Sequence, residues 1–199
     1  IYRNMSRFAK FAQSLASGYA LIGVNVLYTL AMLPLAVRYL GAEQFGLWAG
    51  IMAIATQVQV IADFGMSGSV FRILADHKDD RVSDRYGTVI QTGFLALAVQ
   101  GLLVALVGSA LSFWTPHLLD VPPDYRGISR VLMAGQCVLL GLGFLGRIFN
   151  FILQAHHRFD AGNYSQMASL LSGLLALWAS LEAGLGLYSM LVSSGVGVV

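Results

Sequence analysis

The strongest signal in the sequence is an apolar stretch near its middle, Val89–Phe113, which reads VIQTGFLALAVQGLLVALVGSALSF. It contains no Asp, Glu, Lys or Arg. The hydrocarbon core of a bilayer is about 30 Å thick, and a helix needs roughly 20 apolar residues to cross it. A transmembrane β-strand would instead alternate apolar and polar residues, which this stretch does not do. Because a helix satisfies its peptide groups internally, the stretch predicts a transmembrane helix.

The composition of the whole chain supports the same class. Of its 199 residues, 57% are apolar and only 11% are charged. A soluble domain carries about 25% charged residues to cover its surface. The composition therefore excludes a soluble enzyme and a disordered chain. The net charge of +2 is too small to indicate a nucleic-acid partner.

Five further charge-poor runs flank the central stretch. Helices are expected near residues 18–37, 45–71, 88–113, 129–154, 161–181 and 184–199. The predicted fold is all-α, a polytopic transmembrane bundle of six helices over residues 1–199. The chain begins at Ile1 and ends at Val199 inside an apolar run, so we expect it to be part of a longer protein.

The distribution of basic residues predicts the orientation of this bundle, because cytoplasmic loops are enriched in Lys and Arg. With the N-terminus inside, the cytoplasmic side holds Arg3, Arg7, Lys10, Arg72, Lys78, Arg81, Arg85, Arg147 and Arg158, and the outer side holds Arg38, Arg126 and Arg130. The opposite orientation would invert this bias. We therefore expect a multi-pass protein with a cytoplasmic N-terminus.

Small residues mark the expected contacts between helices. Gly46 and Gly50 form a GxxxG pattern, and Gly101, Ala105 and Ser109 form a stripe along the central helix. Such residues let helix backbones approach closely in lipid.

Asp63 is a polar residue inside an expected span, where burying a charge is costly. Gln59 precedes it by one helical turn and shares its face. Asp63 could line a polar cavity and bind a proton, a cation or an arginine. Alternatively, it marks a helix end or break, for which the following Phe-Gly-Met-Ser-Gly-Ser offers glycines and serines.

Arg147 is the second such residue. Gly143, Arg147, Asn150 and Gln154 recur at helical spacing and form one stripe. A guanidinium beside amides suits a phosphate or a carboxylate. The alternative is an arginine that extends to the lipid headgroups.

Other polar residues in the spans are weaker candidates. They are Asn25, Tyr28, Gln57, Gln91 and Gln100. Each is interpreted first as an interhelical hydrogen bond rather than a ligand contact.

No GxSxG, P-loop or HExxH pattern is present in the sequence, so none of these catalytic motifs is available. The histidines and acidic residues lack the spacing of a metal or acid–base site. Cys137, the one cysteine, is expected to be a buried thiol. We expect neither an enzyme nor a cofactor.

Three segments carry a family resemblance. They are residues 38–49 (RYLGAEQFGLWA), 61–72 (IADFGMSGSVFR) and 151–163 (FILQAHHRFDAGN). Together they resemble the O-antigen and polysaccharide flippases of the multidrug/oligosaccharidyl-lipid/polysaccharide exporter superfamily. The resemblance covers nearly the whole chain but corresponds to the N-terminal six-helix half of such a MATE-like protein, with the second bundle absent.

The resemblance implies transport without bond chemistry. Such proteins translocate an undecaprenyl-diphosphate-linked oligosaccharide across the bacterial or archaeal cytoplasmic membrane by alternating access, during O-antigen, capsule or exopolysaccharide biosynthesis. The implied partners are the lipid-linked oligosaccharide, membrane lipid, and a polysaccharide polymerase or glycosyltransferases.

Roles for individual residues follow as hypotheses. Arg147 and Arg72 would meet the diphosphate, and Asp63 would couple to an ion gradient or pair with an arginine. The substrate path would be lined by Asn25, Gln57, Gln59, Asn150 and Gln154.

Other functions remain open at this point. An ion-coupled multidrug or small-molecule exporter of the same superfamily would use acidic groups deep in its helices, and Asp63 alone is available. A membrane-embedded enzyme would need clustered acids, histidines or a metal site at one face. A purely structural subunit would not explain Arg147 or Asp63.

Overall fold

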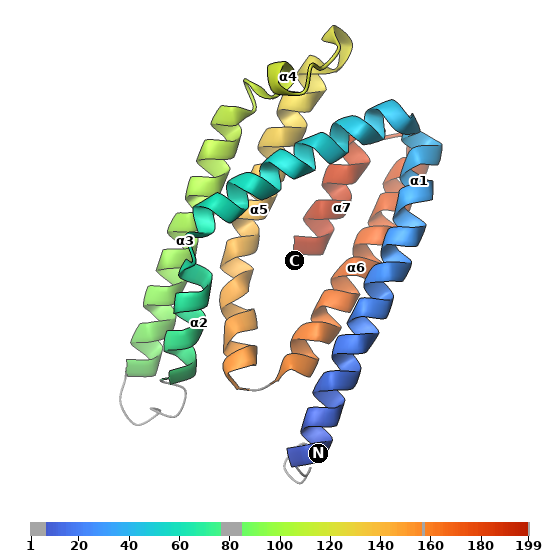
Figure 1. Cartoon of the computed structure of the whole chain (residues 1–199). Coiled ribbons are helices and arrows are strands. Elements are labelled where there is room, and N and C mark those ends of the chain that lie inside the picture. The colour runs from blue at the N-terminus through green and yellow to red at the C-terminus, as the bar shows by residue number, and fades with distance from the viewer. Residues whose placement is uncertain (1–6, 77–84, 157, 199) are drawn as a thin grey trace.

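The computed structural model describes residues 7–76, 85–156 and 158–198, and this part of the chain is helical without strands. The prediction of an all-α membrane-type fold is confirmed (Figure 1). Its elements are α1 (Arg7–Asp63), α2 (Met66–Asp76), α3 (Arg85–Leu111), α4 (Thr115–Leu118), the 3-10 helix η2 (Pro123–Tyr125), α5 (Arg126–Ala155), α6 (Phe159–Glu182) and α7 (Tyr188–Val198). Arg3, Lys78 and Arg81 lie outside the described residues.

Three apolar ranges among the described helices are long enough to cross a membrane. They are Ala12–Asp63, Tyr86–Leu111 and Pro123–Ala155. The first contains 52 residues, which at 1.5 Å per residue is roughly 78 Å of helix, more than twice the hydrocarbon thickness. This range can therefore cross twice, provided that it bends.

The bend is at Gly41. Its φ of 80° and ψ of 165° lie outside the helical region, so the helix is kinked there into two arms. A side chain would strain this backbone, whereas glycine adopts a positive φ readily. Figure 1 shows the first arm running along α6 and the second arm crossing α5 toward α3.

A second interruption separates α1 from α2. Phe64 has a φ of 42° and Gly65 a φ of 74°, so two consecutive residues are left-handed. The helix expected over residues 45–71 is therefore divided. Its first part belongs to the second arm of α1, and its last part is the start of α2.

The apolar interior forms two clusters. One joins both arms of α1 to α5, α6 and α7, and its buried members are Ala36, Leu40, Trp48, Ile51, Ala55, Leu132, Met133, Cys137, Leu177, Leu181, Leu187 and Met190. The other joins α2, α3 and α5 through Val70, Leu74, Leu97, Val104, Phe144, Ile148 and Ala155. Burial of Cys137 confirms the prediction of a buried thiol.

Helices α3 and α5 approach each other along the stripe of small residues. A Cβ placed on Gly101 would lie 2.3 Å from the carbonyl oxygen of Gly141, and the Cβ of Ala105 faces Gly141 at 3.3 Å. The expected close contact along this stripe is confirmed. The Gly46/Gly50 pattern differs, because Gly50 faces Leu119 whereas Gly46 has open space around it.

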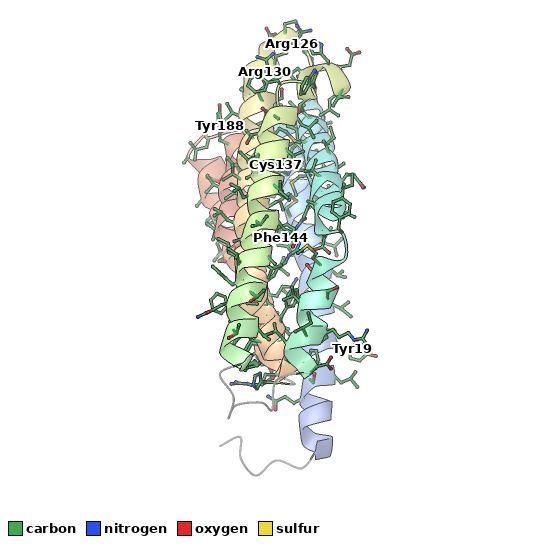
Figure 2. All side chains as sticks on the ribbon, turned by 90° about the vertical axis from the view of Figure 1, so that its left-hand side faces the viewer. Tyr19, Arg126, Arg130, Cys137, Phe144 and Tyr188 are labelled. Atoms are coloured by element: carbon green, nitrogen blue, oxygen red, sulfur yellow. The ribbon has the colours of Figure 1, made fainter. Side chains whose placement is uncertain are left out.

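Apart from the break between α1 and α2, the connections between the helices lie at two opposite ends of the bundle. Figure 1 shows the start of α1, the end of α2, the start of α3 and the α5–α6 connection at one end, and the Gly41 bend, α4 and η2 at the other. The first end holds Arg7, Lys10, Arg72, Arg85 and Arg158, and the second holds Arg38, Arg126 and Arg130. Figure 2 labels Arg126 and Arg130 at this second end.

Candidate functional site

The candidate site begins with the end of α1 at Asp63, within the apolar range of that helix. A helix end leaves carbonyl oxygens without their usual intrahelical partners, which is costly away from water. Nε2 of Gln100 on α3 donates to the carbonyl oxygens of Ala62 at 3.1 Å and Asp63 at 2.8 Å. Gln100 is buried, and the prediction that it forms an interhelical hydrogen bond is confirmed.

Arg147 on α5 forms an ion pair with Asp63 at the same break. Nη1 of Arg147 lies 3.2 Å from Oδ1 of Asp63 and 3.2 Å from Oγ of Ser67. Ser67, in the first turn of α2, also donates its hydroxyl to Oδ1 of Asp63. The three side chains therefore connect α1, α2 and α5 at one point. We name Asp63, Ser67, Gln100 and Arg147 the break cluster.

The aromatic ring of Phe144 packs against the guanidinium of Arg147. The Cζ atom of Arg147 lies 4.0 Å from the centre of the Phe144 ring, which is the geometry of a cation–π contact. Phe144 is one turn before Arg147 on α5, and Figure 2 shows it about midway along the bundle. The arginine side chain therefore extends toward the middle of the bundle, not toward the nearer end of α5.

The depth of Arg147 follows from its place in α5. It precedes the last residue of that helix, Ala155, by eight positions, or roughly 12 Å. The alternative in which Arg147 serves only to reach the headgroups is disfavoured, because its cation is engaged by Asp63 and Phe144 at this depth.

The break cluster is accessible and has unused hydrogen-bonding capacity. The side chains of Arg147 and Asp63 are 31% and 24% exposed. Within the described part of the chain, the hydrogen bonds of Arg147 all come from Nη1, and Oε1 of buried Gln100 has no partner. A guanidinium has five N–H donors, so Nε and Nη2 remain able to bind an anion.

Arg72, the other cation expected at the diphosphate, is not brought to this cluster. It is exposed on α2, five residues after Ser67. At 100° per residue, the two side chains point about 140° apart around the helix.

The expected amide residues lie on other surfaces. Asn25 and Gln57 are exposed on the two arms of α1, and Gln59 is half-buried. On α5, Gln154 is half-buried, and exposed Asn150 faces α6, where a Cβ on Gly162 would lie 3.4 Å from its Oδ1. These residues share helices with the break cluster, but no hydrogen bond between described residues joins them to Arg147.

Sequence reasoning missed the roles of Ser67 and Phe144, and also a polar seam between α1 and α6. In this seam Nδ2 of Asn163 donates to Oγ of Ser17 at 2.9 Å, and Nε2 of Gln13 donates to Oδ2 of Asp160 at 3.4 Å. The spacing Ser67–Val70–Leu74 carries the signal for Ser67, because it places this serine beside the two residues of α2 that face the interior.

Two hollows accompany these contacts. One, of about 330 Å³, lies between α2 and α3 and is mostly apolar, with Met66 at the break as one of its lining residues. The other, of about 210 Å³, lies at the end of the bundle that holds α4 and η2, and it is lined by Glu43, Gln44 and Tyr125 among others. Within the described ranges, no group of three or more His, Cys, Asp or Glu side chains is placed to hold a metal ion.

Comparison with known proteins supports the assignment of family. A protein-family model described as "Polysaccharide biosynthesis protein" matches residues 13–199. No curated protein and no solved structure matches the chain. The match covers both arms of α1, all the later helices and the whole break cluster. This chain is therefore a membrane protein that belongs to the polysaccharide biosynthesis protein family.

Proposed function

We propose that this protein translocates an undecaprenyl-diphosphate-linked oligosaccharide across the cytoplasmic membrane by alternating access. The observation that carries the proposal is the cation of Arg147, held by Asp63 at the break between α1 and α2, which lies away from both ends of the apolar bundle (Figure 1). The family match supports a role in polysaccharide biosynthesis. In this proposal the chain acts as the N-terminal bundle of a MATE-like transporter and catalyses no bond chemistry.

The barrier to such transport is electrostatic. A diphosphate and its sugars would lose their hydration in about 30 Å of hydrocarbon, at a cost of many kcal/mol. A cation with unused donors replaces part of that hydration, because guanidinium–phosphate hydrogen bonds are charge-assisted. The lipid tail can remain in the bilayer throughout.

Each expected residue keeps a role in this proposal. Arg147 binds the diphosphate, and Arg72, nearer the end of the bundle, makes a first contact with it. The sugar path is lined by Asn25, Gln57, Gln59, Asn150 and Gln154. The polymerase or glycosyltransferases that use and supply this lipid are the proposed protein partners.

An ion-coupled small-molecule exporter is the second candidate, and Asp63 is the observation that favours it. Its carboxylate lies at a helix break, where transporters commonly bind coupling ions. The pairing of this carboxylate with Arg147 favours the first candidate, because a coupling ion would have to displace the guanidinium.

The test is translocation in vesicles. The purified protein, as its gene encodes it, is reconstituted with fluorescent lipid-linked oligosaccharide, and transfer between leaflets is followed by quenching. We expect transfer by the wild type, at least a tenfold loss with Arg147→Ala and little change with Arg130→Ala, which removes an exposed arginine of the same helix. Transfer of a drug-like cation but not of the lipid would support the exporter instead.

Orientation is tested separately. Single cysteines are introduced near Arg126 and near Arg158 in a Cys137→Ala background, and intact cells are treated with an impermeant maleimide. A cytoplasmic N-terminus predicts labelling near Arg126 only. Labelling near Arg158 alone would invert the proposed topology.

A further inference from the structure

We infer that the carboxylate of Asp63 substitutes for the anionic headgroup. It pairs with the guanidinium of Arg147 while no ligand is bound, and it competes with the incoming diphosphate for that guanidinium. The inference rests on the proposed function, because it takes the diphosphate as the ligand of Arg147. It assigns to Asp63 a positioning role that is distinct from ion coupling.

The geometry of the pair suits exchange. One oxygen of Asp63 is bound by one nitrogen of Arg147, and the pair is not a two-point fork of the kind that makes the strongest guanidinium–carboxylate contacts. Both side chains remain partly exposed, at 31% and 24%. An anion can therefore reach the guanidinium while the carboxylate is still attached.

The helix break itself does not require this carboxylate. The terminal carbonyl oxygens of α1 are already bound by the side-chain amide of Gln100 from α3. Phe144 already supports the guanidinium. What Asp63 adds is a negative charge beside Arg147, and an incoming diphosphate would supply the same charge.

Exchange has a structural consequence. Arg147 is bound to both Asp63 before the break and Ser67 after it. If the diphosphate takes over the guanidinium, α5 loses these two bonds to the junction of α1 and α2, while Gln100 and Ser67 still hold Asp63. Headgroup binding would thereby release α5 from the break, next to the left-handed Phe64 and Gly65.

The test measures diphosphate affinity in purified protein. Geranylgeranyl diphosphate is titrated into the detergent-solubilised protein by calorimetry, with geranylgeraniol as the probe that lacks the charge. Asp63→Asn should tighten binding by about tenfold, which is typical of the coupling between two linked sites. Asp76→Asn removes an exposed carboxylate of α2 and should leave the affinity unchanged.

Further variants keep the result interpretable. Asp63→Ser is a second neutral replacement in case the asparagine variant does not fold, and Asp63→Glu should keep the weaker, wild-type affinity. If neutral variants that melt cooperatively bind the diphosphate no more tightly than the wild type, the inference is wrong. If wild-type protein binds no diphosphate, or Arg147→Gln binds it as the wild type does, the diphosphate role of Arg147 in the proposed function fails instead.

Discussion

Arg147 on α5 is joined to Asp63, 84 residues earlier in the chain, by a contact of 3.2 Å at the end of α1. The pair adds a polar contact between α5 and the break that separates α1 from α2. It also places a compensated charge at a depth where an isolated charge would be costly.

This pairing predicts a specific pattern of stability. Arg147→Gln and Asp63→Asn should each lower the free energy of unfolding by about 1–3 kcal/mol, because each leaves a partner charge without its counter-charge. The double variant should be less destabilised than the sum of the two single variants. Thermal melting of all four proteins in the same detergent measures this coupling, and strictly additive effects would contradict it.

The side chain of Gln100 should stabilise the junction between α1 and α2. Gln100→Leu removes the donor to the carbonyl oxygens of Ala62 and Asp63, and we expect a loss of about 1–3 kcal/mol. Gln91→Leu on the exposed surface of the same helix is the matched control. Hydrogen exchange of the amides that follow the break should increase in the Gln100 variant only. Equal exchange in both variants would show that the side chain does not hold the junction.

Gly101 should tolerate no side chain. A Cβ there would lie 2.3 Å from the backbone oxygen of Gly141, and neither backbone can move without separating α3 from α5. Gly101→Ala is expected to reduce the yield of folded protein and to cost about 2 kcal/mol or more. Gly87→Ala on the same helix meets nothing within 4 Å and should be neutral or slightly stabilising. Size-exclusion profiles and melting curves compare the two.

Gly65 should be needed for its backbone conformation. Its φ is 74°, so Gly65→Ala should cost about 1 kcal/mol through strain, although open space surrounds the position. Gly68→Ala, three residues later in helical conformation and also in open space, should not be destabilising. A lower melting temperature for the first variant alone is the expected result, and equal melting temperatures would contradict it.

Cys137 should be unreactive in the folded protein. It is fully buried in the contact between α3 and α5, where a Cβ on Gly108 would lie 2.2 Å from its Sγ. A membrane-permeable maleimide should label it only after denaturation. Rapid labelling under native conditions would show that α3 and α5 separate at this level.

Several features of the fold could be predicted from local sequence. The apolar stretch Val89–Phe113 corresponds closely to α3, because the length of a charge-free run reports directly on the solvent around it. The small residues Gly101 and Ala105 also predicted where two backbones meet. The break at Phe64 and Gly65 was one of two alternatives for Asp63, since the same glycines and serines are compatible with a continuous helix.

The site was less predictable. Asp63 and Arg147 were both identified as costly charges, yet their spacing along the chain gave no evidence that they touch. Arg72 and Arg147 are both cations expected toward the same end of the bundle, but the rotation of α2 turns Arg72 away from the break cluster. The contacts of Ser67 and Phe144 with Arg147 were not predictable, because a serine and a phenylalanine are unremarkable in a transmembrane helix.

The sequence by itself determined that this protein lies in lipid and is helical, because both follow from hydropathy over one helix length. It also determined that a few charges must find partners there. Only the tertiary structure decided which partners they are. The meeting of Asp63 with Arg147 depends on the relative rotation and depth of α1 and α5, and these are set by long-range packing such as the approach of Gly101 to Gly141.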